Sequence, residues 1–321
     1  QRQMCIRDSI HINNSFSIIE NKKTKAIAEE IMKIIFLVCA FFAVLAVFSI
    51  TIYMILNGTP AIFKIGLKEI LFETQWAPTA ADPKYGILYV ILTSIVGTTF
   101  AVLIGVPIGV LTAVFIAEVA PKQLTAIVKP AVELLAGIPS VIYGLLGIMI
   151  LNPFMYKIEK IIFKGSSTHQ FTGGSNLISA IIVLAIMILP TVINISESSI
   201  RAVPREMRSA SLALGASKIQ TIFKVVLPVA RSGIMSAIVL GVGRAIGEAM
   251  AITLVSGSSV NLPLPFNSVR FLTTAIVAEM GYAADEHRQV LFTIGLILFF
   301  FIMVVNTVFA KLLSTLSLIH I

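Results

Sequence analysis

Two charged residues stand in the middle of a long apolar segment. Arg244 and Glu248 lie within residues 233–257, which are otherwise almost all apolar or small. An unpaired charge at the centre of a bilayer costs at least about 2.5–3.5 kcal/mol, so both groups are expected to face protein or water. Their spacing of four residues puts them on one face of a continuous helix, one turn apart, where they can form an ion pair.

Two roles are open for this pair. In the first, it is a structural ion pair that locks a helix bundle and touches no substrate. In the second, Arg244 presents its planar donor fork to an oxyanion that moves through the protein, while Glu248 holds the guanidinium in place. Gly241, Gly243 and Gly247 are expected to let another helix approach closely, at a seam that contains both charges.

A second candidate pathway site is formed by Pro139 and Ser140. Pro139 cannot donate a backbone hydrogen bond, and Gly137 and Gly144 loosen the helix on either side of it. Free carbonyl groups and the Ser140 hydroxyl would then line a cavity. An ordinary proline kink is the alternative.

The polar segment 201–230 carries a third motif. Pro204 suits the first turn of a helix, and Gly215 suits the left-handed residue that ends one. A second amphipathic stretch, 218–226, leads to Pro228, where the next apolar segment begins. The segment is therefore predicted to form two short helices joined at Gly215.

The chain that carries these motifs is too apolar for a water-soluble fold. Its 321 residues are 57% hydrophobic and 12% charged, whereas soluble domains carry about 25% charged residues. A soluble enzyme, a disordered tail and a nucleic-acid-binding module are therefore poor interpretations. The net charge of +8 must be explained by where the positive residues fall along the chain.

Six apolar runs are long enough to cross a bilayer, which takes about 20 residues per helix. They cover residues 34–56, 86–117, 131–156, 177–200, 233–257 and 290–313. The second run is expected to be one kinked helix, because a reversal inside lipid would leave backbone groups unpaired. The sequence predicts an all-α integral membrane protein with six transmembrane helices.

Lysine and arginine are concentrated on one side of these spans. With the N-terminus inside, the cytoplasmic segments hold 15 of the 24 basic residues and the outer segments 8, with Arg244 inside a span. This bias predicts that both ends are cytoplasmic (N-in/C-in). Residues 1–33 are then a cytoplasmic N-terminal segment and 34–315 a transmembrane domain that includes the cytoplasmic loop 201–230. The ends 1–9 and 316–321 fit neither neighbouring pattern and are expected not to be native.

The outer side has two long connections, 57–85 and 256–289. Both are of mixed polarity, and the second contains a predicted helix over 269–280. They are either a docking surface for a partner outside the membrane or simple linkers between spans.

The loop 201–230 resembles the coupling loop of ABC-importer permeases. The family pattern is Glu-Ala-Ala, three residues, Gly, nine residues, and then Ile-x-Leu-Pro. The matching residues here are Ser209, Ala210, Ser211, Gly215, Leu227 and Pro228. The spacing is intact, but Ser209 replaces the glutamate, so the helix–Gly–helix geometry is retained while a salt bridge from that position to the ATPase is not expected.

Two further segments, 133–144 and 243–253, make the chain similar to the phosphate-specific ABC transporter permease, and the sequence around Glu248 and Glu279 is closer to its C-type subunit. The resemblance covers about residues 30–313. It implies a type I ABC importer permease fold in a bacterial-type inner membrane and half of a phosphate pathway that opens by alternating access. It also implies that Arg244 and Glu248 matter for phosphate passage.

The resemblance further implies the partners of the chain. They are an A-type sister permease (PstA-like), a cytoplasmic ABC ATPase dimer and an external phosphate-binding protein, with membrane lipid around the spans. The chain has no Gly-x-x-x-x-Gly-Lys-[Ser/Thr] loop, so ATP is used by the partner ATPase and this chain is not an enzyme by itself. No catalytic residue, metal, cofactor or nucleic acid is expected in it.

Two other functions are open. One is a permease for another oxyanion, such as sulfate, molybdate or phosphonate, because one arginine does not readily distinguish tetrahedral oxyanions. The other is an ion-coupled transporter or channel that works without ATP. Such a protein has no need of a dock for an ATPase, so the loop 201–230 is the feature that discriminates.

Overall fold

A computed structural model shows an almost entirely helical chain. The structure describes the backbone of residues 2–166 and 169–318, and the side chains of residues 29–166, 169–308 and 311. Of the ends expected to be non-native, residue 1 and residues 319–321 lie outside the described residues. The chain forms two units, residues 1–56 and residues 57–321. The domain boundaries predicted at residues 33 and 315 remain predictions.

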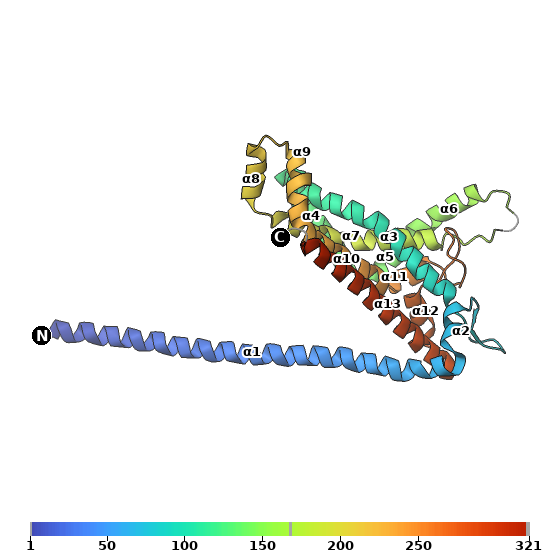
Figure 1. Ribbon diagram of the computed structural model, residues 1–321, viewed down its shortest axis with the longest axis horizontal. Helices are drawn as coiled ribbons and strands as arrows, with labels where there is room; N and C mark the ends of the chain where they lie inside the picture. The colour runs from blue at the N-terminus through green and yellow to red at the C-terminus, as the bar shows by residue number, and fades with distance from the viewer. Residues whose placement is uncertain (1, 167–168, 319–321) are drawn as a thin grey trace. The chain divides into compact units, whose positions relative to one another are not determined.

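The elements are shown in Figure 1. In chain order they are α1 (Arg2–Ile65), α2 (Leu67–Phe72), β1 (Trp76–Ala77), β2 (Lys84–Tyr85), α3 (Leu88–Val114), the π-helical turn η1 (Phe115–Val119), α4 (Lys122–Gly137), α5 (Ser140–Leu146), the π-helical turn η2 (Gly147–Leu151), α6 (Asn152–Ile162), α7 (Leu177–Arg201), α8 (Arg205–Ala213), α9 (Lys218–Thr221), the π-helical turn η3 (Ile222–Val226), α10 (Leu227–Gly247), α11 (Met250–Val255), α12 (Leu272–Glu279) and α13 (Asp285–Leu318).

The predicted number of membrane spans is confirmed. Within the described residues, six helical stretches are long and apolar enough to cross a bilayer. They are Glu29–Ile65, Leu88–Val119, Ser140–Ile162, Leu177–Arg201, Lys218–Gly247 and Asp285–Val308. The second is one unbroken helix through Pro107, as expected.

The third span differs from the prediction because it begins only at Ser140. The residues before it form the separate amphipathic helix α4, which ends at Gly137. Ile138 and Pro139 are extended, with ψ angles of 126° and 141°. The residue before a proline disfavours the helical conformation, so the chain breaks here rather than kinks.

The fifth span also differs from the prediction. The helix begins at Lys218, so the second arm of the 201–230 loop is not a separate short helix, and it runs through η3 to Gly247. The π-helical turn lies directly before Pro228, where the missing backbone donor interrupts regular α-helical bonding. At Glu248 the backbone becomes extended (φ −73°, ψ 128°), and α11 follows.

Helix α7 is the centre of the 57–321 unit. In its most apolar stretch 61% of the residues are buried, against 33% or less in the other spans. Small residues of α3 let the two backbones approach: a Cβ at Gly105 would lie 2.6 Å from Ile188, and one at Gly109 would lie 2.8 Å from Val192. Close packing of this kind is how transmembrane helices associate without a hydrophobic driving force.

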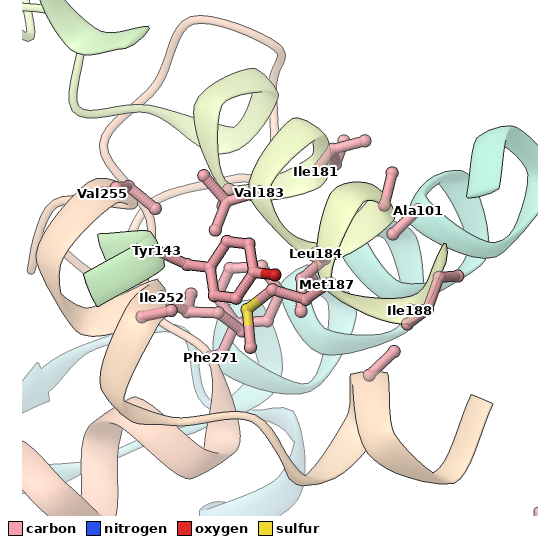
Figure 2. Close-up of a cluster of buried hydrophobic side chains, with 14 of the residues drawn as sticks. Ala101, Tyr143, Ile181, Val183, Leu184, Met187, Ile188, Ile252, Val255 and Phe271 are labelled. Atoms are coloured by element: carbon pink, nitrogen blue, oxygen red, sulfur yellow. The ribbon is translucent and has the colours of Figure 1, made fainter. Parts of the chain in front are cut away.

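The main core surrounds α7 and receives side chains from five other segments, namely α3, α5, α10, α11 and the outer connection before α12. Tyr143 of α5, Ile252 of α11 and Phe271 of the outer connection converge on Leu184 and Met187 (Figure 2). Part of the chain between the fifth and sixth spans therefore folds back into the membrane domain instead of lying on its surface.

The outer connections are folded structures and not simple linkers. Strands β1 and β2 form an antiparallel hairpin. The buried carboxylate of Glu279, at the end of α12, accepts hydrogen bonds from Trp76 (3.1 Å) and Arg270 and contacts His287 Nε2 at 2.7 Å. Burial raises the pKa of the Tyr85 phenol, whose ring packs edge-on against Trp76. The predicted helix over 269–280 is confirmed as α12.

Candidate functional site

Arg244 lies in the last turn of α10 and is half-buried. Its Nη1 donates a hydrogen bond to Thr191 Oγ1 of α7, at 3.3 Å. A hydroxyl group is a neutral acceptor, so this bond orients the guanidinium without placing a counter-charge beside it. Thr191 was not predicted from the sequence; its one signal there is a hydroxyl next to Pro190 in an apolar run.

The predicted ion pair between Arg244 and Glu248 is wrong. Among the ion pairs of the described residues, these two side chains do not form one, because the helix ends at Gly247 and Glu248 lies beyond it. The Glu248 carboxylate instead accepts the backbone N–H of Ala251 at 3.0 Å, which satisfies a free donor in the first turn of α11.

The backbone of Glu248 is also held from the outer side of the protein. Thr273, on α12, donates a hydrogen bond to the Glu248 carbonyl oxygen at 2.7 Å. The Glu248 carbonyl oxygen has no helical N–H to accept, because α10 ends before it, and the Thr273 hydroxyl replaces that partner. No signal in the sequence connects these two residues, which are 25 positions apart.

The other break lies at Ile138 and Pro139, and Ser140 is the first residue of α5. Helices α5 and α11 pack closely: a Cβ at Gly144 would lie 3.0 Å from Ala251, and Gly147 lies against Val255. Both helices run in the same direction, and Ser140 and Glu248 lie about one turn before these contacts. The structure therefore brings the two predicted candidate regions to the same depth.

A cavity of about 560 Å³ opens beside the break at Pro139. The lining comes from the end of α4 and the linking residues: Pro130, Glu133, Leu134, Gly137, Ile138 and Pro139. Ser140 does not belong to this lining, so the cavity predicted at the break lies on its α4 side. The carbonyl of Leu135, in the last turn of α4, accepts the hydroxyl of Tyr143 at 2.7 Å and the N–H of Ile138 at 3.3 Å.

The expected close helix approach is found at only one of the three glycines near Arg244. A Cβ at Gly241 would meet Val192 at 3.0 Å, whereas Gly243 and Gly247 have no neighbour within 4 Å of that position among the described residues. Within the described residues, the Cβ positions of these two glycines therefore face open space.

The 201–230 segment forms a helical elbow, which we define as α8, the turn 214–217, α9 and η3. Gly215 has a φ of +86°, a conformation that side chains with a Cβ rarely adopt, so the predicted role of this glycine is confirmed. Ser217 and Gln220 form a capping box at the start of α9. Ser211 contacts Thr221 at 3.0 Å and holds the two arms together.

The other residues of the loop motif have local roles. Ser209 bonds to the carbonyls of Arg205 and Glu206 within its own helix, and Ala210 is exposed. Leu227 and Pro228 form the first turn of α10.

Both arms of the elbow carry exposed apolar side chains. They are Met207, Leu212, Leu214, Ile219 and Phe223, and we call this set the elbow patch. Leu214 is 90% exposed at the tip. Exposed apolar residues that gather in one place mark a contact site for a partner.

Ion pairs that were not predicted from the sequence lie at the inner ends of the spans, and one of them reaches the elbow. Arg208 of α8 bonds to Glu118 of η1 through Nε (3.0 Å) and Nη2 (2.7 Å). The buried Glu197 of α7 pairs with Lys129 of α4, at 3.1 Å, and with Arg201. The signal for the first pair was Glu118 itself, an acidic residue at the end of an apolar run.

Comparisons with known proteins agree with this architecture. A family model described as "binding-protein-dependent transport system inner membrane component" matches residues 105–316. The probable ABC transporter permease protein YqgH of Bacillus subtilis (strain 168) is 36% identical over 310 residues, which cover 94% of this chain and 97% of the relative.

Other relatives have a stated substrate. The phosphate transport system permease protein PstC of Xylella fastidiosa (strain 9a5c) is 34% identical over 282 residues, covering 85% of this chain and 86% of the relative. The protein of the same name from Haemophilus influenzae is 32% identical, covering 78% and 82%. These relatives confirm the resemblance to C-type permeases seen in the sequence.

One solved structure supports the fold alone. The MetNI methionine ABC transporter in an inward-facing conformation has a chain with a TM-score of 0.50 and 20% identity, covering 72% of this chain and 94% of that one.

Proposed function

This chain belongs to the family of inner membrane components of binding-protein-dependent transport systems, and from this premise we propose that it is the C-type permease subunit of an ATP-driven phosphate importer. Its six spans and its family place it in a bacterial plasma membrane as a multi-pass protein. The proposal for phosphate is supported by the relatives named PstC and by the chemistry of Arg244.

The observation that carries this proposal is the environment of Arg244. Its bonded partner is the hydroxyl of Thr191 and not a carboxylate, so the positive charge remains available to an anion. Arg244 lies one turn before Glu248, at the depth where the backbone is broken in two neighbouring segments. A guanidinium binds the oxygens of phosphate through paired donors. The contact must be weak, because transport requires release.

The proposed cycle is alternating access. The helix from Lys218 to Gly247 joins the elbow directly to Arg244, so a movement of the elbow reaches the pathway through one rigid element. When the partner ATPase binds or hydrolyses ATP, the pathway closes on one side of the membrane and opens on the other. ATP binding and hydrolysis belong to a partner, and this chain supplies no catalytic group to them.

Three partners complete the proposed importer. A cytoplasmic ATPase dimer docks on the elbow patch, and an external phosphate-binding protein docks on the folded outer connections. An A-type sister permease covers the open face of α10 at Gly243 and Gly247 and supplies the other half of the pathway.

The second candidate is import of another tetrahedral oxyanion. It is favoured by the single guanidinium, since sulfate, molybdate and a phosphonate present the same oxygens to it. Selectivity between them then rests mainly with the binding protein. An ion-coupled transporter or channel is disfavoured, because it would leave the elbow patch without a partner.

Uptake by the reconstituted importer tests the proposal. The chain is purified with its sister permease, ATPase and binding protein, inserted into liposomes, and supplied with radiolabelled phosphate. We expect uptake that requires ATP inside the liposomes and that resists excess sulfate. Uptake without ATP would contradict the ABC mechanism. Full competition by sulfate would show that the importer accepts tetrahedral oxyanions in general and is not specific for phosphate.

A further inference from the structure

The first arm of the elbow, helix α8, has no buried residue of its own. Its second arm is different: Ile222 and Val226 are buried and pack with Ala113 of α3 and Ile200 of α7. Apolar packing therefore anchors the second arm to the membrane spans, whereas α8 needs another means of attachment.

Arg208 supplies that attachment. Its side chain is 20% exposed, and that of Glu118 is 13% exposed. Besides the two bonds to Glu118, the guanidinium donates to the carbonyl of Ile200 at 2.8 Å and to the carbonyl of Val203. One side chain thus binds α8 to the inner end of the second span and to the inner end of the fourth.

The strength of this joint follows from its surroundings. Charge-assisted bonds to a carboxylate are about twice as strong as neutral ones, and they gain further when both groups are partly withdrawn from water. The carbonyls of Ile200 and Val203 lie where α7 ends. Ile200 also accepts the N–H of Val203, so Arg208 adds a second donor to a helix end that has lost its regular bonding pattern.

We propose that Glu118 and Arg208 form a clamp that transmits movement of the elbow to the second span, and that Arg208 is a positioning residue for energy coupling. This inference rests on the proposed function. Without the clamp, the ATPase still docks on the elbow patch, but α8 moves without displacing α3. Hydrolysis then continues without import.

Charge reversal tests the clamp in the complete importer. We expect Glu118→Arg and Arg208→Glu each to lower ATP-dependent phosphate uptake by about tenfold or more, within the range typical of coupling between two sites. Capture of the ATPase is retained and its hydrolysis no longer depends on the loaded binding protein. The double variant, with both charges exchanged, recovers most of the lost uptake.

A matched control has the same net charge as this double variant but does not restore the ion pair between positions 118 and 208. Lys224 is exposed on the neighbouring arm and has no ion pair among the described residues. Glu118→Arg combined with Lys224→Glu should not recover uptake. Recovery in this control, or wild-type uptake in either single reversal, would overturn the clamp.

Hydrogen exchange provides a readout that does not depend on transport. In Arg208→Gln the backbone amides of α8 should exchange faster, while those of η3 stay unchanged because apolar packing holds them. Unchanged exchange in α8 would refute the clamp even if uptake falls. If the wild-type complex fails to import phosphate, the proposed function fails, and the exchange result still decides whether Arg208 holds α8.

Discussion

Arg244 is held by a hydroxyl group, and this determines what its removal should do. In Arg244→Gln the charge is lost, while Thr191 loses one hydrogen-bond donor and remains a neutral hydroxyl, so membrane insertion and assembly should be retained. We expect phosphate uptake to fall by about tenfold or more, as for the loss of a charged hydrogen bond. Thr191→Val is the control: it leaves the charge in place, and its uptake should fall less. Normal uptake by Arg244→Gln in liposomes would assign Arg244 a purely structural role.

Glu248 provides a second test at the scale of single residues. Its carboxylate accepts the N–H of Ala251, which an amide oxygen can also do. Glu248→Gln should therefore keep most of the transport activity, whereas Glu248→Ala loses a bond of the capping type, worth about 1 kcal/mol, and lowers the thermal stability of the purified protein. If Glu248→Gln loses as much transport activity as Glu248→Ala, the negative charge itself is required at this position.

Among the elements, the close contact between α3 and α7 depends on glycines of α3, which have no side chain to hold the helices apart. Gly109→Leu would drive new atoms into Val192, and overpacking of this kind costs about 1–3 kcal/mol. We expect a lower unfolding temperature and less protein in the membrane. Gly281→Leu is the matched control, because Gly281 has no neighbour within 4 Å of its Cβ position. A similar loss in both variants would mean that leucine itself, and not the helix contact, is responsible.

The turn at Gly215 gives a prediction based on backbone conformation alone. A Cβ there meets nothing within 4 Å, so any cost comes from the positive φ. Gly215→Ala should destabilise the elbow by about 1–2 kcal/mol and weaken capture of the ATPase in a pull-down, whereas Gly215→Asn should do so less. Equal capture by all three proteins would contradict the need for a fixed turn.

The sequence was a good guide to the elements and a poor one to their breaks. Hydropathy reports immersion in lipid and not helical continuity, so the apolar run 233–257 conceals the end of α10 at Gly247. The break at Pro139 left a visible proline, and a discontinuity that lines a cavity was predicted there, with a plain kink as the alternative. The run 131–156 nevertheless was predicted as one span, and the separate helix α4 was not foreseen. The break at Glu248 has no such signal, because it is stabilised by Thr273 from a distant helix.

At the scale of the whole assembly, we predict that the ATPase binds to the elbow patch. Leu214→Asp places a charge at its most exposed position and should reduce capture of the ATPase from detergent extracts. Leu264→Asp is the control, with the same substitution at a half-exposed leucine of the outer connection. Equal capture by the two variants would argue against the elbow patch as the docking site.

The number of spans and the family were predictable because they depend on composition and local spacing. The partners of the site residues were not. Thr191 lies 53 positions from Arg244, and Glu118 lies 90 positions from Arg208. Such contacts arise only when the helices are packed, and no periodic pattern encodes them.

The unbroken helix from Lys218 to Gly247 has a mechanical consequence. At about 1.5 Å per residue, roughly 40 Å separate Lys218 from Arg244. Pivoting such a rod about its lower end through about 10° carries the guanidinium sideways by roughly 7 Å, more than one turn of helix. A small rotation of the cytoplasmic end of the helix therefore displaces the Arg244 guanidinium far enough to break its contact with a bound anion.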